Sequence, residues 1–337
     1  MSVRWMRLAA ACAMGSALLT GPVWAQPKQA AGKAAAPAPA AAPAQPTAGT
    51  PAAPAAASPA VTPTLQRVRD TGVITLAHRE SSIPFSYLDG NKRAIGYAMD
   101  LCMKVVEALR RELKVPVRVE YLPVSPAQRI PVIVEGKADL ECGNTTNTAA
   151  RRKQAAFTVT HFFAGGRLLV RSDSGIQRLA DMRGKTIVAN AGSTHAAFLN
   201  KAKEKGVFAG TIVEAKDADG AFAELNAKRA DAYLHDDIVL YALRANSTEP
   251  RQWDIVGEFT TVEPLAVMLR RDDPEFKKFV DVTLGRAMVD GEVLALYKKW
   301  FQGPIPPKGV TLGIPLSPLL REQFTFPSDK VGDELGG

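Results

Sequence analysis

Cysteine, histidine and aromatic residues are scarce in this chain of 337 residues. It contains three cysteines and four histidines, and aromatic residues make up 7% of the sequence. No cysteines and histidines have the spacing of a zinc site, and no cysteine is paired with a histidine in the manner of a catalytic nucleophile. We therefore expect neither a bound metal nor a cofactor.

Long apolar runs are also rare. Residues 8–19 are apolar, but they are too few to span a membrane comfortably. Arg4 and Arg7 precede this run, and small residues ending at Ala25 follow it. This order is typical of a secretory signal peptide covering residues 1–25. We therefore expect export and a periplasmic location.

Residues 26–63 lack aromatic side chains and carry almost no charge, because alanine and proline dominate them. Such a segment buries too little apolar surface to fold, which predicts a disordered linker. Four of the eight net positive charges lie before residue 64, so the remainder carries a net charge of +4. This charge is weak and dispersed, and it does not favour a nucleic acid as a partner.

Two cysteines remain after removal of the signal peptide, which contains Cys12. Export permits a disulfide between Cys102 and Cys142. Cys102 falls on a helical pattern and Cys142 at the end of a predicted strand, so the sequence does not give their separation. We expect buried free thiols at both positions.

The most informative stretch is ADLECGNTTNTAARR, at residues 138–152. It predicts an apolar strand, a polar turn and the start of a helix near Ala149. Backbone N–H groups at such a turn bind carboxylates and phosphates. Arg151 is placed to hold a carboxylate with two parallel hydrogen bonds. The alternative is an ordinary turn with Arg151 in solvent.

Other predicted strands also end in polar residues. Arg79 follows a short apolar strand, and the ends of strands line the ligand crevice in open α/β sheets. The alternative is a surface arginine paired with Glu80 or Asp100. Arg129 follows the next strand in the same way.

The second half of the folded region contains another α/β unit. Ser193 and Thr194 lie in a polar turn between a strand and a helix, and a strand over residues 230–234 leads to Asp236. The order of elements predicts two α/β lobes, with the second inserted into the first, and a pocket for a small polar ligand between them. Crossing segments near Gly165 and residues 260–263 would act as hinges. We place lobe 1 at residues 64–163 and 262–325, lobe 2 at residues 168–257 and a tail at residues 326–337.

Several motifs between about residue 65 and about residue 319 together carry a resemblance. They are HRESSIPFSYLDG (78–90), QRIP (128–131), ECGNTTN (141–147), RRKQAAF (151–157), LRRDDPEFKK (269–278) and KWFQGPIPPK (299–308). With these motifs the chain resembles the periplasmic solute-binding proteins of amino-acid ABC transporters (family 3), and most of all their glutamate/aspartate-binding branch. The resemblance implies the type II periplasmic-binding-protein fold, capture of an acidic or related polar amino acid, delivery to a membrane permease, and no catalysis.

The resemblance also implies roles at the amino-acid end of the ligand. Arg151 matches the arginine that holds the α-carboxylate, assisted by Thr146 and by the turn that contains Ser193 and Thr194. Asp236 matches the residue that takes the α-ammonium. A zwitterion requires one positive and one negative partner, which agrees with this assignment.

At the distal end, Arg79 and Arg129 match the residues that hold the side-chain carboxylate. The chain departs from the branch at Pro126 and Ala218, where the branch usually has serine and histidine, and at Asn144, which replaces a serine. We include Asn144 among the ligand-binding residues. The departures leave the identity of the amino acid open.

Two other classes of protein remain as alternatives. An exported enzyme on the same fold, such as a dehydratase, would need a general acid or base in the cleft. No histidine has an evident nucleophile or metal partner, although Glu80, His235 and Asp237 could lie near the cleft. A sensory module that docks to a receptor is the other alternative. We expect a monomer.

Overall fold

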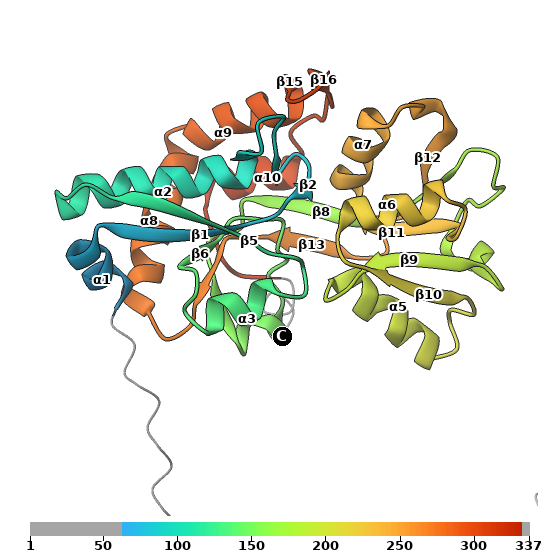
Figure 1. Ribbon diagram of the computed structural model, residues 1–337, viewed down its shortest axis with the longest axis horizontal. Helices are drawn as coiled ribbons and strands as arrows, with labels where there is room; N and C mark the ends of the chain where they lie inside the picture. Colours follow the sequence, from blue (N-terminus) through green and yellow to red (C-terminus); the bar gives the residue numbers. More distant parts are fainter. Residues whose placement is uncertain (1–62, 332–337) are drawn as a thin grey trace, which may run out of the picture. The chain divides into compact units, whose positions relative to one another are not determined.

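The computed structural model describes residues 63–331 (Figure 1). The expected signal peptide, the linker up to residue 62 and the last six residues of the tail lie outside the described residues. Within this range, none of the helices combines the length and the apolar character that crossing a membrane requires.

The first sheet has five strands in the order β5-β1-β6-β14-β7. Strand β1 is parallel to β5 and β6, and β14 is antiparallel to its two neighbours. Parallel neighbours end at the same edge, so polar residues that follow β1, β5 and β6 meet there. The strands are β1 (Val73–His78), β5 (Arg118–Pro123), β6 (Leu140–Glu141), β7 (Ala155–Phe157) and β14 (Met268–Arg270).

Helices cover this sheet on both faces. Helices α2 (Tyr97–Leu113), α8 (Pro274–Val289) and α9 (Glu292–Tyr297) pack together on one side, and α3 (Arg129–Val134) lies on the other (Figure 1). Helix α2 begins at Tyr97, directly after a glycine. Gly96 precedes it with φ 135°, and a Cβ there would lie 2.3 Å from the carbonyl oxygen of Phe85. Only glycine permits this close approach.

The second sheet has the order β10-β9-β11-β8-β12, and β13 pairs with β8. Helices α5 (Thr194–Glu204), α6 (Ala218–Asn226) and α7 (Asp237–Asn246) pack against it. The strands are β8 (Phe162–Arg171), β9 (Thr186–Asn190), β10 (Thr211–Ala215), β11 (Ala232–Asp236), β12 (Trp253–Val256) and β13 (Val262–Leu265).

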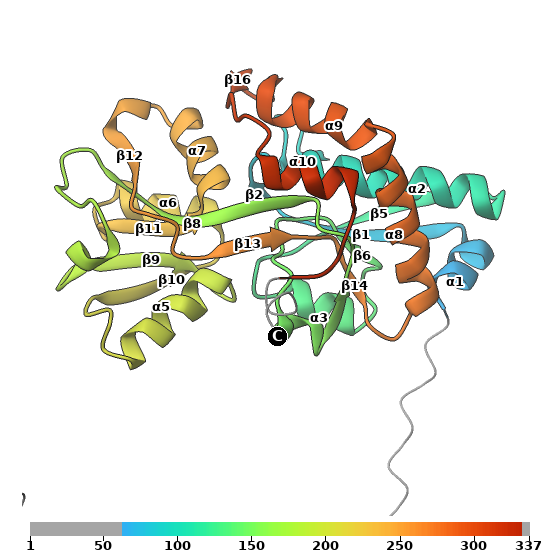
Figure 2. The same ribbon diagram turned by 180° about the vertical axis from the view of Figure 1, so that it is seen from behind.

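Strand β8 is the crossing segment that is predicted near Gly165. Its first part pairs with β13, and its second part pairs with β11 and β12 (Figure 2). The chain returns to the first sheet through two strands, because β13 pairs with β8 and β14 joins the first sheet. A Cβ at Gly165 would lie 2.2 Å from the Phe259 ring, so a larger residue where the crossing segments meet would displace that ring.

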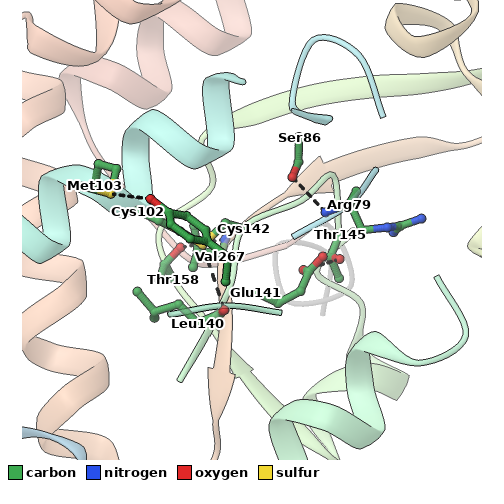
Figure 3. Close-up of a disulfide and its surroundings, with 11 residues drawn as sticks. Arg79, Ser86, Cys102, Met103, Leu140, Glu141, Cys142, Thr145, Thr158 and Val267 are labelled. Carbon is green, nitrogen blue, oxygen red and sulfur yellow. Dashed lines mark hydrogen bonds between the residues drawn. A yellow bond between two sulfur atoms is a disulfide. The ribbon is translucent and has the colours of Figure 1, made fainter. Parts of the chain in front are cut away.

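Cys102 and Cys142 form a disulfide (Figure 3). The expectation of two free thiols is wrong. Helix α2 packs on the first sheet with Cys102 facing the end of β6, which brings the two Cα atoms to 6.2 Å, within the range for disulfides. This distance depends on how the helix packs on the sheet, and the sequence pattern contains no such information.

Candidate functional site

Polar residues from the strand ends of both sheets line one small pocket. Its free space is about 20 Å³, enough for about one water molecule. An amino acid therefore requires side chains or whole elements to move before it enters. The lining residues are Arg79, Pro126, Arg129, Asn144, Thr146, Asn190, Ser193, Thr194, His195, His235 and Asp236. Seven of the eight predicted site residues are among them. The eighth, Arg151, donates hydrogen bonds to the backbone of Thr146 and Gly192.

Arg151 is buried, so its predicted alternative as a solvent-exposed side chain is wrong. It lies on α4 (Ala149–Arg152), whose first turn is capped by the Thr148 side chain accepting from the Arg151 N–H. Its guanidinium donates to the carbonyl oxygens of Thr146, at 2.9 Å, and Gly192, at 3.2 Å. Burial, together with the nearby Arg129 charge, lowers the pKa of Arg151 to about 9. These carbonyl partners are weaker than a carboxylate would be.

Arg129 opens helix α3 and points into the same region. It donates to the Thr145 hydroxyl at 3.0 Å and to the Gly192 carbonyl oxygen at 3.4 Å. Thr145 in turn donates to Glu141 at 2.6 Å, so a buried carboxylate lies behind this arginine. Burial lowers the pKa of Arg129.

Arg79 is also buried, with 3% of its surface exposed. Its backbone N–H donates to the Ser86 hydroxyl at 2.9 Å, which fixes the end of β1 (Figure 3). The alternative of a surface ion pair is wrong, because Glu80 is exposed and the Asp100 carboxylate accepts from Lys299 and Trp300. Burial, and next the charge of Arg129, lowers the pKa of Arg79 to about 10. In the described part of the chain, no hydrogen bond or ion pair engages its guanidinium.

Asp236 supplies a negative charge on the other side of the pocket. It is the last residue of β11 and accepts from the Asn144 side chain at 2.8 Å. Burial raises the pKa of Asp236, and the nearby Glu263 carboxylate raises it further. The contact joins Asn144 of the first sheet's edge to Asp236 of the second sheet.

Glu263 is a buried carboxylate that the sequence analysis did not single out. It lies on β13 and accepts from the hydroxyls of Thr146 and Thr194. Ser193 has a local role, because its hydroxyl accepts from the Ala196 N–H and caps α5. The available signal for Glu263 was a charged residue at the start of the otherwise apolar run EPLAVML.

Two histidines complete the pocket, and the sequence suggests a place near the cleft for only one of them, His235. His195 and His235 are buried, with ring centroids 5.3 Å apart. With Asp236 they could bring ligand atoms within 4.8 Å of one another, as a metal site would. However, His235 Nδ1 accepts the Asp236 backbone N–H at 2.6 Å, so the lone pair of that nitrogen is already engaged. We assign no metal to this cluster.

Pro126 and Ala218, where the chain differs from the glutamate/aspartate-binding branch, lie in different environments. Pro126 lines the pocket. Ala218 is the first residue of α6, is 1% exposed and packs in the apolar core instead of lining the pocket.

Comparison with known proteins gives the chain its family. The family model of bacterial extracellular solute-binding proteins, family 3, matches residues 74–303. This chain belongs to that family. The family 3 protein is 39% identical over 269 residues to a glutamate/aspartate import solute-binding protein of Escherichia coli, which covers 80% of this chain and 89% of that protein. It is 40% identical over 280 residues to an L-glutamate/L-aspartate-binding protein of Pseudomonas aeruginosa, covering 82% and 92%.

Solved structures agree with this membership. An ancestral arginine-binding protein bound to glutamine matches the family 3 protein with a TM-score of 0.61 at 28% identity, over 68% of this chain and 98% of that chain. The ancestral amino acid-binding protein AncCDT-1, a precursor of cyclohexadienyl dehydratase, matches with a TM-score of 0.61 at 26% identity, over 72% and 100%. The predicted two-lobed α/β fold is confirmed. The E. coli and P. aeruginosa relatives are solute-binding proteins and not enzymes, in agreement with the expectation of no catalysis.

Proposed function

We propose that this family 3 protein captures a dicarboxylic amino acid, glutamate or aspartate, between its lobes and delivers it to an ABC permease in the periplasm. The observation that carries the proposal is the burial of Arg79, Arg129 and Arg151 around one pocket that also contains Asp236. Buried charges need partners, and a zwitterion with a second carboxylate offers the complementary set. The relatives named above support the same class of ligand.

The individual roles follow from the contacts. Arg151 takes the α-carboxylate, because its present partners are two carbonyl oxygens that a carboxylate would outcompete. Asp236 takes the α-ammonium, with the Asn144 side chain orienting its carboxylate. Arg79 takes the distal carboxylate, since its guanidinium has no protein partner within residues 63–331.

The remaining residues support these contacts. Arg129 joins Arg79 at the distal end. Thr146 and Thr194 both donate to Glu263 and border the α-amino end, and Ser193 caps the helix beside it.

The lobes that close on the ligand are those expected from the sequence, at residues 64–163 with 262–325 and at residues 168–257. The continuous strand β8 and its partner β13 provide the two crossing segments. Residues 1–25 direct export, and the mature protein acts as a monomer with no nucleic acid partner. Pro126 supplies no hydroxyl at the distal end, so amides compete more strongly than in a pocket with a complete hydrogen-bond set.

The experiment is calorimetry of the mature protein with glutamate, aspartate, glutamine and asparagine. A thermal-shift screen against the other amino acids precedes it, because a ligand that binds only the folded state raises its stability. We expect the dicarboxylic amino acids to bind most tightly, with measurable competition from their amides. Absence of binding by both glutamate and aspartate would refute the proposal.

A further inference from the structure

When all of their side chains are ionised, the buried charged residues of the pocket balance one another before any ligand is added. Three arginines contribute positive charge, and the three carboxylates of Glu141, Asp236 and Glu263 contribute negative charge. All six side chains are buried, with at most 8% of their surface exposed. A dicarboxylic amino acid adds one ammonium and two carboxylates, so the closed site would hold one excess negative charge. A neutral amino acid such as glutamine adds none.

An uncompensated charge in a buried site is costly, so a nearby group that gains a proton would lower the free energy of the complex. His195 is placed for this role. Its side chain is 2% exposed, and its Nε2 atom has no hydrogen-bond partner. That atom lies 3.6 Å from Asp236 Oδ1 and 4.0 Å from Glu263 Oε1. A proton on Nε2 would therefore face two carboxylate oxygens.

The hydrogen bonds that Glu263 accepts leave its other carboxylate oxygen directed toward His195. Thr146 and Thr194 both donate to its Oε2 atom, which leaves Oε1 facing His195. Once the ligand's ammonium occupies Asp236, Glu263 remains as the partner of a charged His195. Without a ligand, burial lowers the pKa of His195, and the charges of Arg151 and Arg129 act in the same direction.

Other titratable groups around His195 are less suited to take the proton. His235 faces it from β11, but its Nδ1 accepts a backbone N–H, and burial together with His195 lowers its pKa. Asp237 is half-buried and accepts from the N–H groups of Gly165 and Ile238. The Tyr233 hydroxyl donates to Asn190.

The charge of Asp217 acts on Arg79 and on Tyr233, and its carboxylate caps α6. Glu141 accepts from the Thr145 hydroxyl behind Arg129, and Arg79 faces the pocket from the end of β1.

We propose that the pocket takes up one more proton when it binds a dicarboxylic amino acid than when it binds the corresponding amide, and that His195 holds this proton against Glu263. The inference rests on the proposed function and names His195 as a residue that determines specificity. The proton comes from solvent, and no covalent bond other than the N–H bond forms. Between the pKa of His195 in the free protein, about 4, and its pKa in the complex, linkage then requires that the affinity for glutamate, relative to glutamine, falls about tenfold for each unit rise in pH.

The experiment is calorimetry of the mature protein in buffers with different enthalpies of ionisation. The slope of the observed enthalpy against the buffer enthalpy gives the number of protons taken up. Titrations with glutamate and with glutamine at about pH 6 start from a free protein whose His195 is neutral, because its pKa there is about 4. Both titrations share the same free protein, so a proton already held on Asp236 cancels in the difference. We expect a difference of about one proton between the two ligands.

Two variants distinguish His195 from its neighbours. His195→Gln keeps a donor toward the carboxylates but cannot hold a charge, so the difference between the ligands should vanish while glutamine binding persists. His161→Phe is the control, because His161 is buried outside the pocket, and it should keep the difference. Circular dichroism checks that both variants are folded.

The outcomes separate the two proposals. Equal proton uptake for glutamate and glutamine by the wild-type protein overturns this inference but leaves the proposed function intact. A difference that survives in His195→Gln overturns the role of His195. Failure of glutamate and aspartate to bind at all overturns the proposed function, and this inference with it.

Discussion

Arg129 and Arg151 donate to the same acceptor, the carbonyl oxygen of Gly192, at 3.4 and 3.2 Å. The two arginines come from helices beside the first sheet, whereas Gly192 follows β9 of the second sheet. One neutral carbonyl oxygen therefore serves two buried cations. A ligand carboxylate would give Arg151 a stronger, charged partner at this position.

The first prediction concerns Arg151. Arg151→Ala should reduce amino-acid affinity by at least a hundredfold, because removing one partner of a buried ion pair costs on the order of 3–5 kcal/mol. Calorimetry with glutamate and glutamine measures the effect on both ligands, since both have an α-carboxylate. Lys153→Ala removes an exposed cation next to the same helix and should leave the affinity unchanged. Equal affinities for wild type and Arg151→Ala would contradict the assigned role.

The second prediction tests closure of the two sheets on each other. Gly192 has φ +72°, and a Cβ there would lie 2.9 Å from the Cα of Ala127 on the opposite side. Gly192→Ala should therefore oppose closure and weaken ligand binding. Gly184→Ala is a matched control, because Gly184 has the same φ but open space around its Cβ position. Both variants place an alanine at positive φ, which costs about 1–2 kcal/mol of backbone strain.

Small-angle scattering measures the contraction on ligand binding, and calorimetry measures the affinity. The wild type and Gly184→Ala should contract when saturated with ligand, and Gly192→Ala should contract less and bind more weakly. If the two glycine variants lose the same affinity, backbone strain alone explains the effect, and the contact with Ala127 is not important for closure.

The third prediction concerns the disulfide. Cys102 and Cys142 are 40 residues apart in sequence, and a crosslink over a loop of this length stabilises a protein by about 4 kcal/mol in the chain-entropy model. Replacing both cysteines with serine should lower the free energy of unfolding by roughly this amount. Urea denaturation measures it, with the wild type in reducing agent as a second comparison. A variant as stable as the oxidised wild type would show that the bond adds nothing to stability.

The fourth prediction is a pH dependence of stability. His161 is fully buried with neither ring nitrogen hydrogen-bonded, and burial lowers its pKa to about 3. Below about pH 6.5 the unfolded chain binds a proton at this residue that the folded protein does not bind. Stability therefore falls as the pH falls from about 6.5 toward 3.

His161→Phe should remove this contribution, which amounts to about 2 kcal/mol between pH 6.5 and pH 5. Urea denaturation at both pH values measures it. His195 and His235, whose pKa values are also lowered by burial, contribute a loss of stability in the same direction. A pH dependence identical to that of the wild type would exclude His161 as a contributor.

The sequence predicts local features of the site well. Strand, polar turn and helix follow in order around Arg151, and parallel strands bring Arg79 and Arg129 to the same edge. The alternation of apolar and polar segments is enough for this, because it depends on neighbours along the chain. The same pattern places Asp236 at the end of its strand.

Contacts between distant segments were not predicted. Glu263 binds hydroxyls from two other segments, and Cys102 meets Cys142 only when α2 has packed on the sheet. The placement of Ala218 was also not predictable. The resemblance puts this residue at the distal end of the ligand, whereas the structure buries it in the core. These placements follow from packing between elements, which a sequence pattern does not encode.

The disulfide between Cys102 and Cys142 also changes what proteolysis does to this protein. The enclosed segment contains Arg129 and the loop before it, parts of which are exposed. A single cut inside the segment leaves both fragments covalently joined, with Arg129 tethered beside the turn that contains Asn144. A nicked molecule in a protease-rich compartment would therefore run as two bands only after reduction, and it would keep the two halves of its pocket together.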